Sequence, residues 1–131
     1  MKSISRSIAT GVALGALATA GLAAPAAAKS GDVRVAGRCT AASTAKLKLA
    51  PRPSDRRTRV EFEVDQNVVG QTWNVRIADN GVVVVNRSAT TVAPSGSFTV
   101  ATRRPGSSGH AIVATATNAS TGESCRAAAA V

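Results

Sequence analysis

Hydrophobic and polar residues alternate with a period of two through most of this chain beyond residue 31. The clearest case is the segment 59–65, in which apolar and charged side chains alternate in the order Arg-Val-Glu-Phe-Glu-Val-Asp. A period of two places successive side chains on opposite faces of a β-strand. The same part of the chain lacks the sustained 3.6-residue period of an amphipathic helix. The pattern therefore predicts an all-β fold.

Seven or eight short strands account for this alternation. We expect them at 33–35, 47–49, 59–65, 73–78, 82–85, 98–100, 112–116 and, as a possible eighth, 125–131. The segment 82–85 is a continuous run of valines, which is typical of a strand covered on both faces. Trp73 is in phase with Val75 and Ile77, so we expect its side chain in the core rather than on the surface.

Turn-forming residues separate these segments. Asp79-Asn80-Gly81 is the strongest signal, because Asn-Gly tolerates the positive φ angles of a tight hairpin. Proline- and glycine-containing breaks follow at 51–55, 94–96 and 104–106, and 118–122 would turn the last hairpin. Short strands at this spacing favour an antiparallel immunoglobulin-like β-sandwich, with a small closed barrel as the alternative.

Successive reversal of the strands divides the loops between two ends of the domain. The loops at 51–58, 79–81 and 103–109 would share one end, and 39–44, 66–70, 87–96 and 118–124 would share the other. Cys39 and Cys125, the two cysteines of the chain, both fall at the second end and in phase with inward-facing residues. We therefore expect an intramolecular disulfide, with two unpaired thiols or an interchain bond as alternatives. Closure of so long a loop should stabilise the fold by about 4–5 kcal/mol on the chain-entropy account.

The first 28 residues have the pattern of a cleaved signal peptide. Lys2 and Arg6 form a positive n-region, an uncharged Ala- and Gly-rich stretch follows, and Ala26-Ala27-Ala28 matches the small residues of a cleavage site. A membrane-spanning helix is the competing interpretation of this stretch. We expect cleavage after Ala28 and secretion of residues 29–131 as one β-sandwich domain, so that the cysteines reach an oxidising compartment.

A resemblance adds to this interpretation. The run from Trp73 to Gly81, followed by the valines of 82–85, resembles the Trp-bearing central hairpin of many bacterial immunoglobulin-like domains. Together with Arg38-Cys39 and the segments 45–49, 60–65 and 118–125, it is similar to a group of small secreted actinobacterial proteins without an assigned function. The spacing from Cys39 to Trp73 is longer than in antibody domains. The resemblance therefore implies an architecture and no active site.

The chain is strongly basic, with a formal net charge of +9, and its arginines gather in two of the predicted loops. The candidate ligand-binding residues are Arg52, Arg56, Arg57, Arg103 and Arg104. Guanidinium groups bind phosphates and carboxylates through paired hydrogen bonds, so an anionic cell-wall polymer, an anionic membrane surface or an extracellular protein would be a suitable partner. The alternative is a solvated rim that keeps the protein soluble. We expect no specific nucleic-acid recognition, because no exposed aromatic residues are predicted to stack on bases.

No pattern in the sequence indicates catalysis. His110 is the single histidine, and no spacing assigns it a nucleophile and an orienting carboxylate, so we expect a surface or strand-edge residue. We expect no cofactor and no metal site, because one histidine and two disulfide-bonded cysteines provide no set of ligands. Glu61, Glu63 and Asp65 are expected on the wet face of a strand beside Lys46 and Lys48. The sequence thus favours a secreted non-enzymatic binding module, with an inhibitor or effector of an extracellular enzyme as the alternative.

Overall fold

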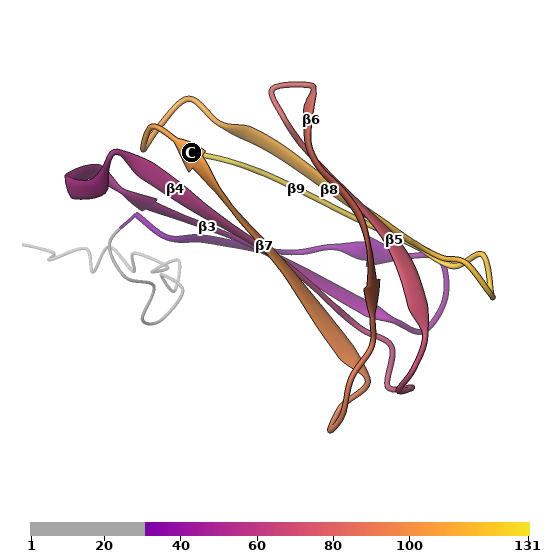
Figure 1. Ribbon diagram of the computed structural model, residues 1–131. Coiled ribbons are helices and arrows are strands. Elements are labelled where there is room, and N and C mark those ends of the chain that lie inside the picture. Colours follow the sequence, from indigo (N-terminus) through magenta and orange to yellow (C-terminus); the bar gives the residue numbers. More distant parts are fainter. Residues whose placement is uncertain (1–30) are drawn as a thin grey trace, which may run out of the picture.

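The computed structural model describes residues 31–131, which form an all-β domain (Figure 1). Its nine strands are β1 Val33–Ala36, β2 Arg38–Cys39, β3 Thr44–Arg52, β4 Arg57–Asp65, β5 Thr72–Asp79, β6 Val82–Thr90, β7 Ser97–Pro105, β8 Ala111–Asn118 and β9 Ser124–Ala130. A single 3-10 turn, Pro53–Asp55, lies between β3 and β4. The predicted signal peptide and its cleavage site lie outside the described residues. Within 31–131, no helix is long and apolar enough to cross a bilayer.

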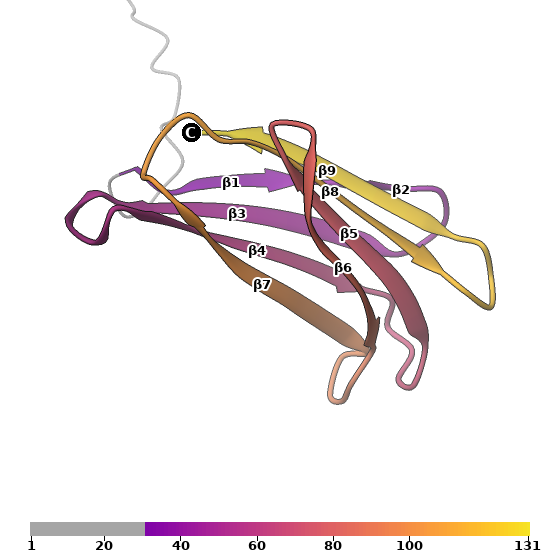
Figure 2. The ribbon, with the colours of Figure 1, turned by 45° about the horizontal axis from the view of Figure 1, so that its top comes forward.

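The strands form two antiparallel sheets that pack face to face (Figure 2). The first sheet has the order β1-β3-β4-β7, and the second has the order β2-β9-β8-β5-β6. This arrangement confirms the predicted all-β sandwich. The expected strands are all present, and the unexpected element is the short strand β2.

Gly37 explains how the chain passes from β1 to β2, which belong to different sheets. Its N–H donates to the carbonyl of Ala45 at 2.8 Å. A Cβ atom at this position would lie 2.8 Å from the carbonyl oxygen of Arg126 and 2.9 Å from Cβ of Ala45. Only glycine allows the backbone to pass this closely between β3 and β9. The chain therefore leaves the first sheet here and joins the second.

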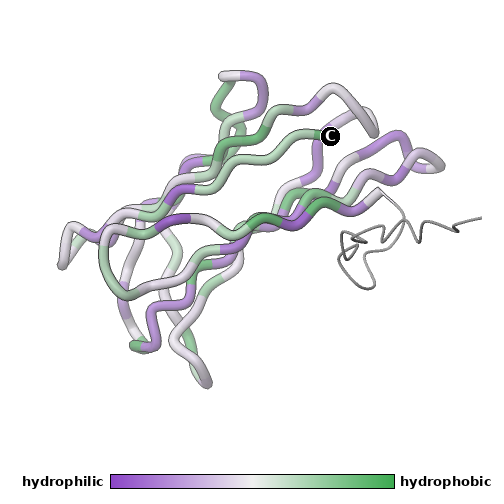
Figure 3. Tube along the Cα trace, turned by 180° about the vertical axis from the view of Figure 1, so that it is seen from behind, coloured by the Kyte–Doolittle hydropathy of each residue, from purple (hydrophilic) through white to green (hydrophobic). Residues whose placement is uncertain are grey.

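Alternation along the strands fills the space between the sheets with apolar side chains. The largest fully buried ones are Trp73, Phe62, Leu47, Leu49, Ile77 and Ile112. Trp73 lies in the core, as predicted, with its ring centroid 6.1 Å from that of Phe98. Its indole N–H donates to Oε1 of Gln66 at 2.9 Å, so its polar atom is satisfied inside the protein. Figure 3 shows the alternation of hydrophobic and hydrophilic residues along the backbone.

The valines of 82–85 are more exposed than the sequence predicted. Strand β6 forms one edge of the second sheet and extends to Thr90, well beyond residue 85. Val82 is 64% exposed and Val83 is 48% exposed, so the prediction of a strand covered on both faces is wrong. The run contains a change of register opposite Ile77 and Ala78, which bends the strand at this edge. Apolar composition alone did not show which strand would lie at an edge.

The connections between the sheets differ from those of immunoglobulin constant domains. In those domains the second strand connects directly to a strand of the opposite sheet. Here the chain returns from β2 to the first sheet, where β3 and β4 form a hairpin, and its next crossing is from β4 to β5. The domain therefore has two packed sheets, but its chain passes between them at different points from the chain of an immunoglobulin constant domain.

The disulfide joins Cys39 of β2 to Cys125 of β9, as predicted. The two residues are directly opposite each other in the β2–β9 pairing, with a Cα–Cα distance of 4.0 Å. The bond therefore links neighbouring strands of one sheet. Because β2 pairs only with β9, the disulfide fixes the N-terminal part of the domain to its last strand.

Candidate functional site: the arginine-bearing end

The three loops predicted to share one end do so. The N–H of Gly106 donates to the carbonyl of Arg56 at 2.7 Å, which joins the β3–β4 loop to the β7–β8 loop. The amide Nδ2 of Asn80 donates to the carbonyl of Gly109 at 2.8 Å, which adds the β5–β6 turn. At the opposite end, the N–H of Gln66 donates to the carbonyl of Gly96 at 3.0 Å. The predicted division of the loops between the two ends is therefore confirmed.

Arg104 does not face solvent as a free ligand-binding group would. It alternates with exposed residues of β7 and points toward the interior, where its Nε–H donates to Oδ2 of Asp79 at 3.0 Å. The same Oδ2 lies 2.7 Å from Nδ1 of His110. Arg104 is therefore part of a hydrogen-bonded cluster with the buried residues Asp79 and His110, although 30% of its own side chain is exposed.

The prediction that His110 is a surface or strand-edge residue is wrong. His110 directly precedes β8, and only 7% of it is exposed. Its Nε2 lies 2.9 Å from the carbonyl oxygen of Gly106, so the ring closes the 106–109 loop against the body of the domain. The flanking Ser, Gly and Pro residues indicated a loop, but nothing local to them showed that the loop folds back over the ring.

The surroundings of His110 indicate a structural role. Both ring nitrogens face acceptors, the Asp79 carboxylate and the Gly106 carbonyl. The ring satisfies both contacts when both nitrogens carry a hydrogen. Neither contact is to a hydroxyl or thiol group, so the arrangement lacks the nucleophile of a hydrolytic triad.

The charge of Asp79 is stabilised by its two partners. Burial raises the pKa of this carboxyl, but the hydrogen bonds from Arg104 and His110 and the positive charges of both lower it more. The pKa of Asp79 therefore lies below its usual value. The ionised carboxylate holds together β5, β7 and the start of β8.

Arg52 is held in a similar way at the edge of the first sheet. Its Nη1 donates to Oδ1 of Asp32 at 2.8 Å, and Nζ of Lys48 lies 3.9 Å from Oδ2 of the same residue. The hydrogen bond from Arg52 is the largest influence on this carboxyl, and it lowers the pKa of Asp32 despite the opposing effect of burial. Arg52 is thus anchored, although its side chain remains 37% exposed.

The outer face of the first sheet brings four guanidinium groups together. Arg57 is directly opposite Arg52 in the β3–β4 pairing, and Arg59 is directly opposite Arg103 in the β4–β7 pairing. Opposite residues of this kind have their Cβ atoms about 4.5–5.5 Å apart. We call Arg52, Arg57, Arg59 and Arg103 the outer arginine cluster. They line an open depression of about 480 Å³ together with Asp55.

The charges in this cluster are only partly neutralised. Arg59 donates to Glu61 at 2.9 Å, and Arg52 is paired with Asp32. Within residues 31–131, Arg57 and Arg103 form no ion pair, and both are exposed. Two adjacent cross-strand pairs of like charge are unfavourable by themselves, so an anion bound between them would relieve repulsion.

The sequence analysis placed three of these four residues at the arginine-bearing end and did not include Arg59. The feature that would have identified Arg59 is the alternation of side chains between the two faces of a strand. Arg57 and Arg59 are two positions apart on β4 and therefore share a face, whereas Arg104 and Arg103 are adjacent on β7 and face opposite ways. Arg56 lies apart from this face, exposed at the turn that follows Pro53–Asp55.

The predicted wet face of β4 lies further along the same sheet. Glu61 and Glu63 are opposite Lys48 and Lys46 in the β3–β4 pairing, as expected, and Nζ of Lys48 lies 3.9 Å from Glu61. This part of the face is balanced in charge. It separates the outer arginine cluster from the opposite end of the domain.

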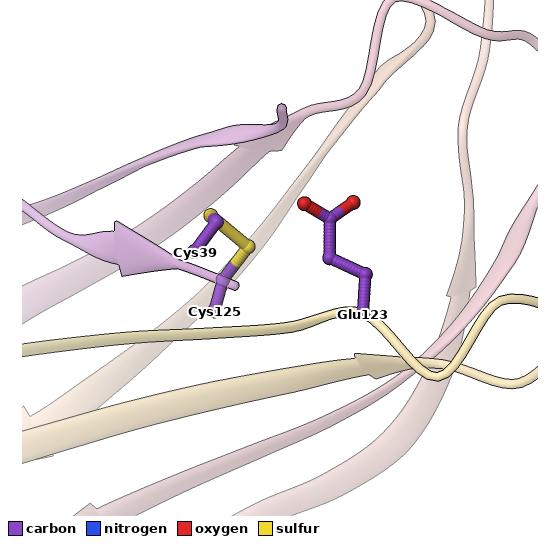
Figure 4. A group of neighbouring side chains, drawn as sticks. All are labelled: Cys39, Glu123 and Cys125. Atoms are coloured by element: carbon purple, nitrogen blue, oxygen red, sulfur yellow. A yellow bond between two sulfur atoms is a disulfide. The ribbon is translucent and has the colours of Figure 1, made fainter. Parts of the chain in front are cut away.

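The disulfide end contains one further buried carboxylate, Glu123, which points toward the β2–β3 loop beside Cys39 and Cys125 (Figure 4). Its Oε2 accepts the N–H groups of Ala41 and Ser43 at 3.0 and 3.1 Å, and its Oε1 accepts the hydroxyl of Ser43. Sequence analysis did not single out this residue. Because the two sulfur atoms are bonded to each other and the carboxylate is occupied by the loop, this group acts as a structural clamp.

No family model, curated protein or solved structure matches this chain.

Proposed function

We propose that this protein is a secreted, non-enzymatic binding module that binds an anionic extracellular polymer through the outer arginine cluster. The observation that carries the proposal is the placement of Arg52 opposite Arg57 and of Arg59 opposite Arg103, with Arg57 and Arg103 not neutralised within residues 31–131. Guanidinium groups in adjacent positions can bind several phosphate or carboxylate groups of one chain.

The architecture supports a binding role. Two sheets, a disulfide and the hydrogen-bonded cluster of Asp79, Arg104 and His110 make a rigid support beneath the arginine-bearing face. We further propose that the domain is immunoglobulin-like in its layers and in its Trp-bearing β5–β6 hairpin, with the altered crossing described above. Secretion, by cleavage after Ala28, belongs to the same proposal and accords with the disulfide.

The test compares binding to purified cell-wall polymer and to anionic liposomes at low and high salt. The double variant Arg57→Gln/Arg103→Gln should reduce retention at low salt, and salt should release the wild-type protein because exposed charges are screened. The matched control is Arg34→Gln/Lys46→Gln, which removes two charges from the same sheet away from the cluster. Binding that is insensitive to salt, or equal losses in both variants, would contradict the assignment of the site.

A second function, inhibition of an extracellular enzyme by the 103–109 loop, is favoured by one observation. The loop is held at two points, by Gly106 N–H to the carbonyl of Arg56 and by Gly109 N–H to the carbonyl of Val131 at 2.9 Å. A loop fixed in this way loses little entropy on binding. Stoichiometric inhibition of a secreted protease or glycosidase that Arg103→Ala abolishes would support this alternative.

A further inference from the structure

The outer face of the second sheet differs from that of the first in its charge. The five strands of the second sheet contain four arginines and a single carboxylate, Asp79. Asp79 is buried and faces the interior, where its carboxylate is hydrogen-bonded to Arg104 and His110. The solvent-facing side of this sheet therefore carries positive charge and no carboxylate from its own strands.

Three of these arginines lie in one row across the strands. Arg76 of β5 is opposite Thr115 of β8, Thr115 is opposite Arg126 of β9, and Arg126 is opposite Arg38 of β2. Residues paired in this way point to the same face. We call Arg38, Arg126 and Arg76 the arginine row. With neighbouring strands about 4.8 Å apart, it extends over roughly 15 Å.

The side chains of the row face solvent. Arg76 is exposed between buried Val75 and Ile77, and Arg126 is exposed between buried Cys125 and Ala127. Across the part of the chain that the structure describes, none of the three arginines forms an ion pair. Arg38 and Arg126 are nearest neighbours of like charge on paired strands, which destabilises a sheet unless a counter-charge is bound.

The residues beside the row are suited to an extended polar ligand. On the side toward the disulfide end, hydroxyl and amide groups continue across the sheet in Ser88, Asn74, Thr117 and Ser124, which are linked by the strand register. On the other side lie the small apolar residues Ala78, Val113 and Ala128. The face therefore provides cations and hydrogen-bonding groups without bulky side chains that would obstruct a polymer.

The chemistry of the face indicates which anion it would take. Guanidinium groups match phosphates in geometry, and the nearby hydroxyl and amide groups can donate to further phosphate oxygens. The aromatic side chains Trp73, Phe62 and Phe98 are all buried, so the surface has no platform for stacking nucleobases or sugar rings. A linear phosphate polymer without such rings is the ligand that fits best.

We infer that the outer face of the second sheet is a second binding surface for a linear phosphate polymer, laid across the strands along the arginine row. This inference rests on the proposed function, which assigns polymer binding to the outer arginine cluster. The two arginine groups belong to opposite outer faces of the sandwich, with the apolar core between them (Figure 2). One molecule can therefore bind two polymer strands and bridge them.

The test uses inorganic polyphosphate as the probe in two steps. Protein is first bound to immobilised polyphosphate, and labelled polyphosphate is then added to measure capture of a second chain. The wild-type protein should bind and capture. The row variant Arg38→Gln/Arg76→Gln/Arg126→Gln should still bind the immobilised polyphosphate, but its capture of labelled polyphosphate should fall by roughly tenfold or more. The cluster variant Arg57→Gln/Arg59→Gln/Arg103→Gln should show the same loss of capture.

The controls separate the two surfaces from a general effect of charge. Arg34→Gln/Lys46→Gln/Arg87→Gln removes three charges outside both groups and should capture as the wild type does. If the row variant captures normally while the cluster variant does not, the second surface is refuted and the proposed function stands. If only the row variant loses binding, the row is supported and the assignment to the cluster fails. Absence of binding by the wild-type protein refutes both.

The remaining outcomes concern folding and the chemistry of the ligand. The urea midpoint of the row variant should equal or exceed that of the wild type, because the substitutions remove repulsion from exposed positions. A lower midpoint would contradict the view that the row is not neutralised. Poly-L-glutamate, which carries carboxylates, should compete more weakly than polyphosphate, and equal competition would overturn the preference for phosphate.

Discussion

Asp79 is the residue on which the arginine-bearing end most depends, because one of its oxygens accepts from both Arg104 and His110. Asp79→Asn removes the negative charge and leaves the guanidinium of Arg104 without its anionic partner and the ring of His110 without its carboxylate acceptor. We expect the free energy of unfolding to fall by about 2–4 kcal/mol. Urea unfolding at neutral pH measures this change. The control is Asp55→Asn, an exposed residue for which the change should stay within about 0.5 kcal/mol.

The same carboxyl makes the stability of the domain depend on pH. The pKa values of Asp79 and Asp32 are lowered in the folded protein from about 3.8, so both residues bind a proton less readily when folded than when unfolded. Their stabilising contribution is complete well above this value and is lost as the pH falls through the lowered values. Between pH 7 and pH 3, Asp79→Asn should therefore lose less stability than the wild type. Equal losses would contradict this assignment.

At the scale of the elements, the passage from β1 to β2 is closely constrained by the neighbouring strands β3 and β9. Gly37→Ala places a methyl group against the carbonyl of Arg126 and the side chain of Ala45. Overpacking of this kind should destabilise the domain by about 1–3 kcal/mol and weaken the β2–β9 pairing. Urea unfolding measures the loss, and hydrogen exchange of the Thr40 amide, which donates to the carbonyl of Ser124, reports the pairing. Ala36→Ser, at an exposed neighbouring position, should leave both unchanged.

The strands could be predicted because each combines two alternating faces with a recognisable turn. The alternation of 59–65 and the Asn80-Gly81 turn both appear as predicted, with Asn80 and Gly81 at positive φ. What could not be predicted was the position of each strand in its sheet. The valine run predicts burial equally well at the centre and at an edge, and only the pairing of β5 with both β6 and β8 places β6 at the edge.

The candidate site was predictable to the same degree. Reversal of successive strands correctly brought the arginine-bearing loops together, since this needs only the number of strands. The arginine row could not be found in this way, because Arg38, Arg76 and Arg126 come from three separate segments. They align only through the register of β2, β9, β8 and β5, which no local pattern specifies. For the same reason, the contact between His110 and Asp79 was missed.

At the scale of the whole molecule, export and oxidation are linked, and one experiment tests both. Protein collected from the medium of an expressing host should begin at Lys29 and should gain the mass of two hydrogen atoms on reduction. Reduction should also lower the urea midpoint by the equivalent of about 2–5 kcal/mol, because the bond between Cys39 and Cys125 restricts the unfolded chain. The variant Cys39→Ser/Cys125→Ser is the control, and reductant should not affect its stability. A retained leader would contradict the predicted cleavage, whereas a mass unchanged by reductant would show that the thiols are not bonded in the exported protein.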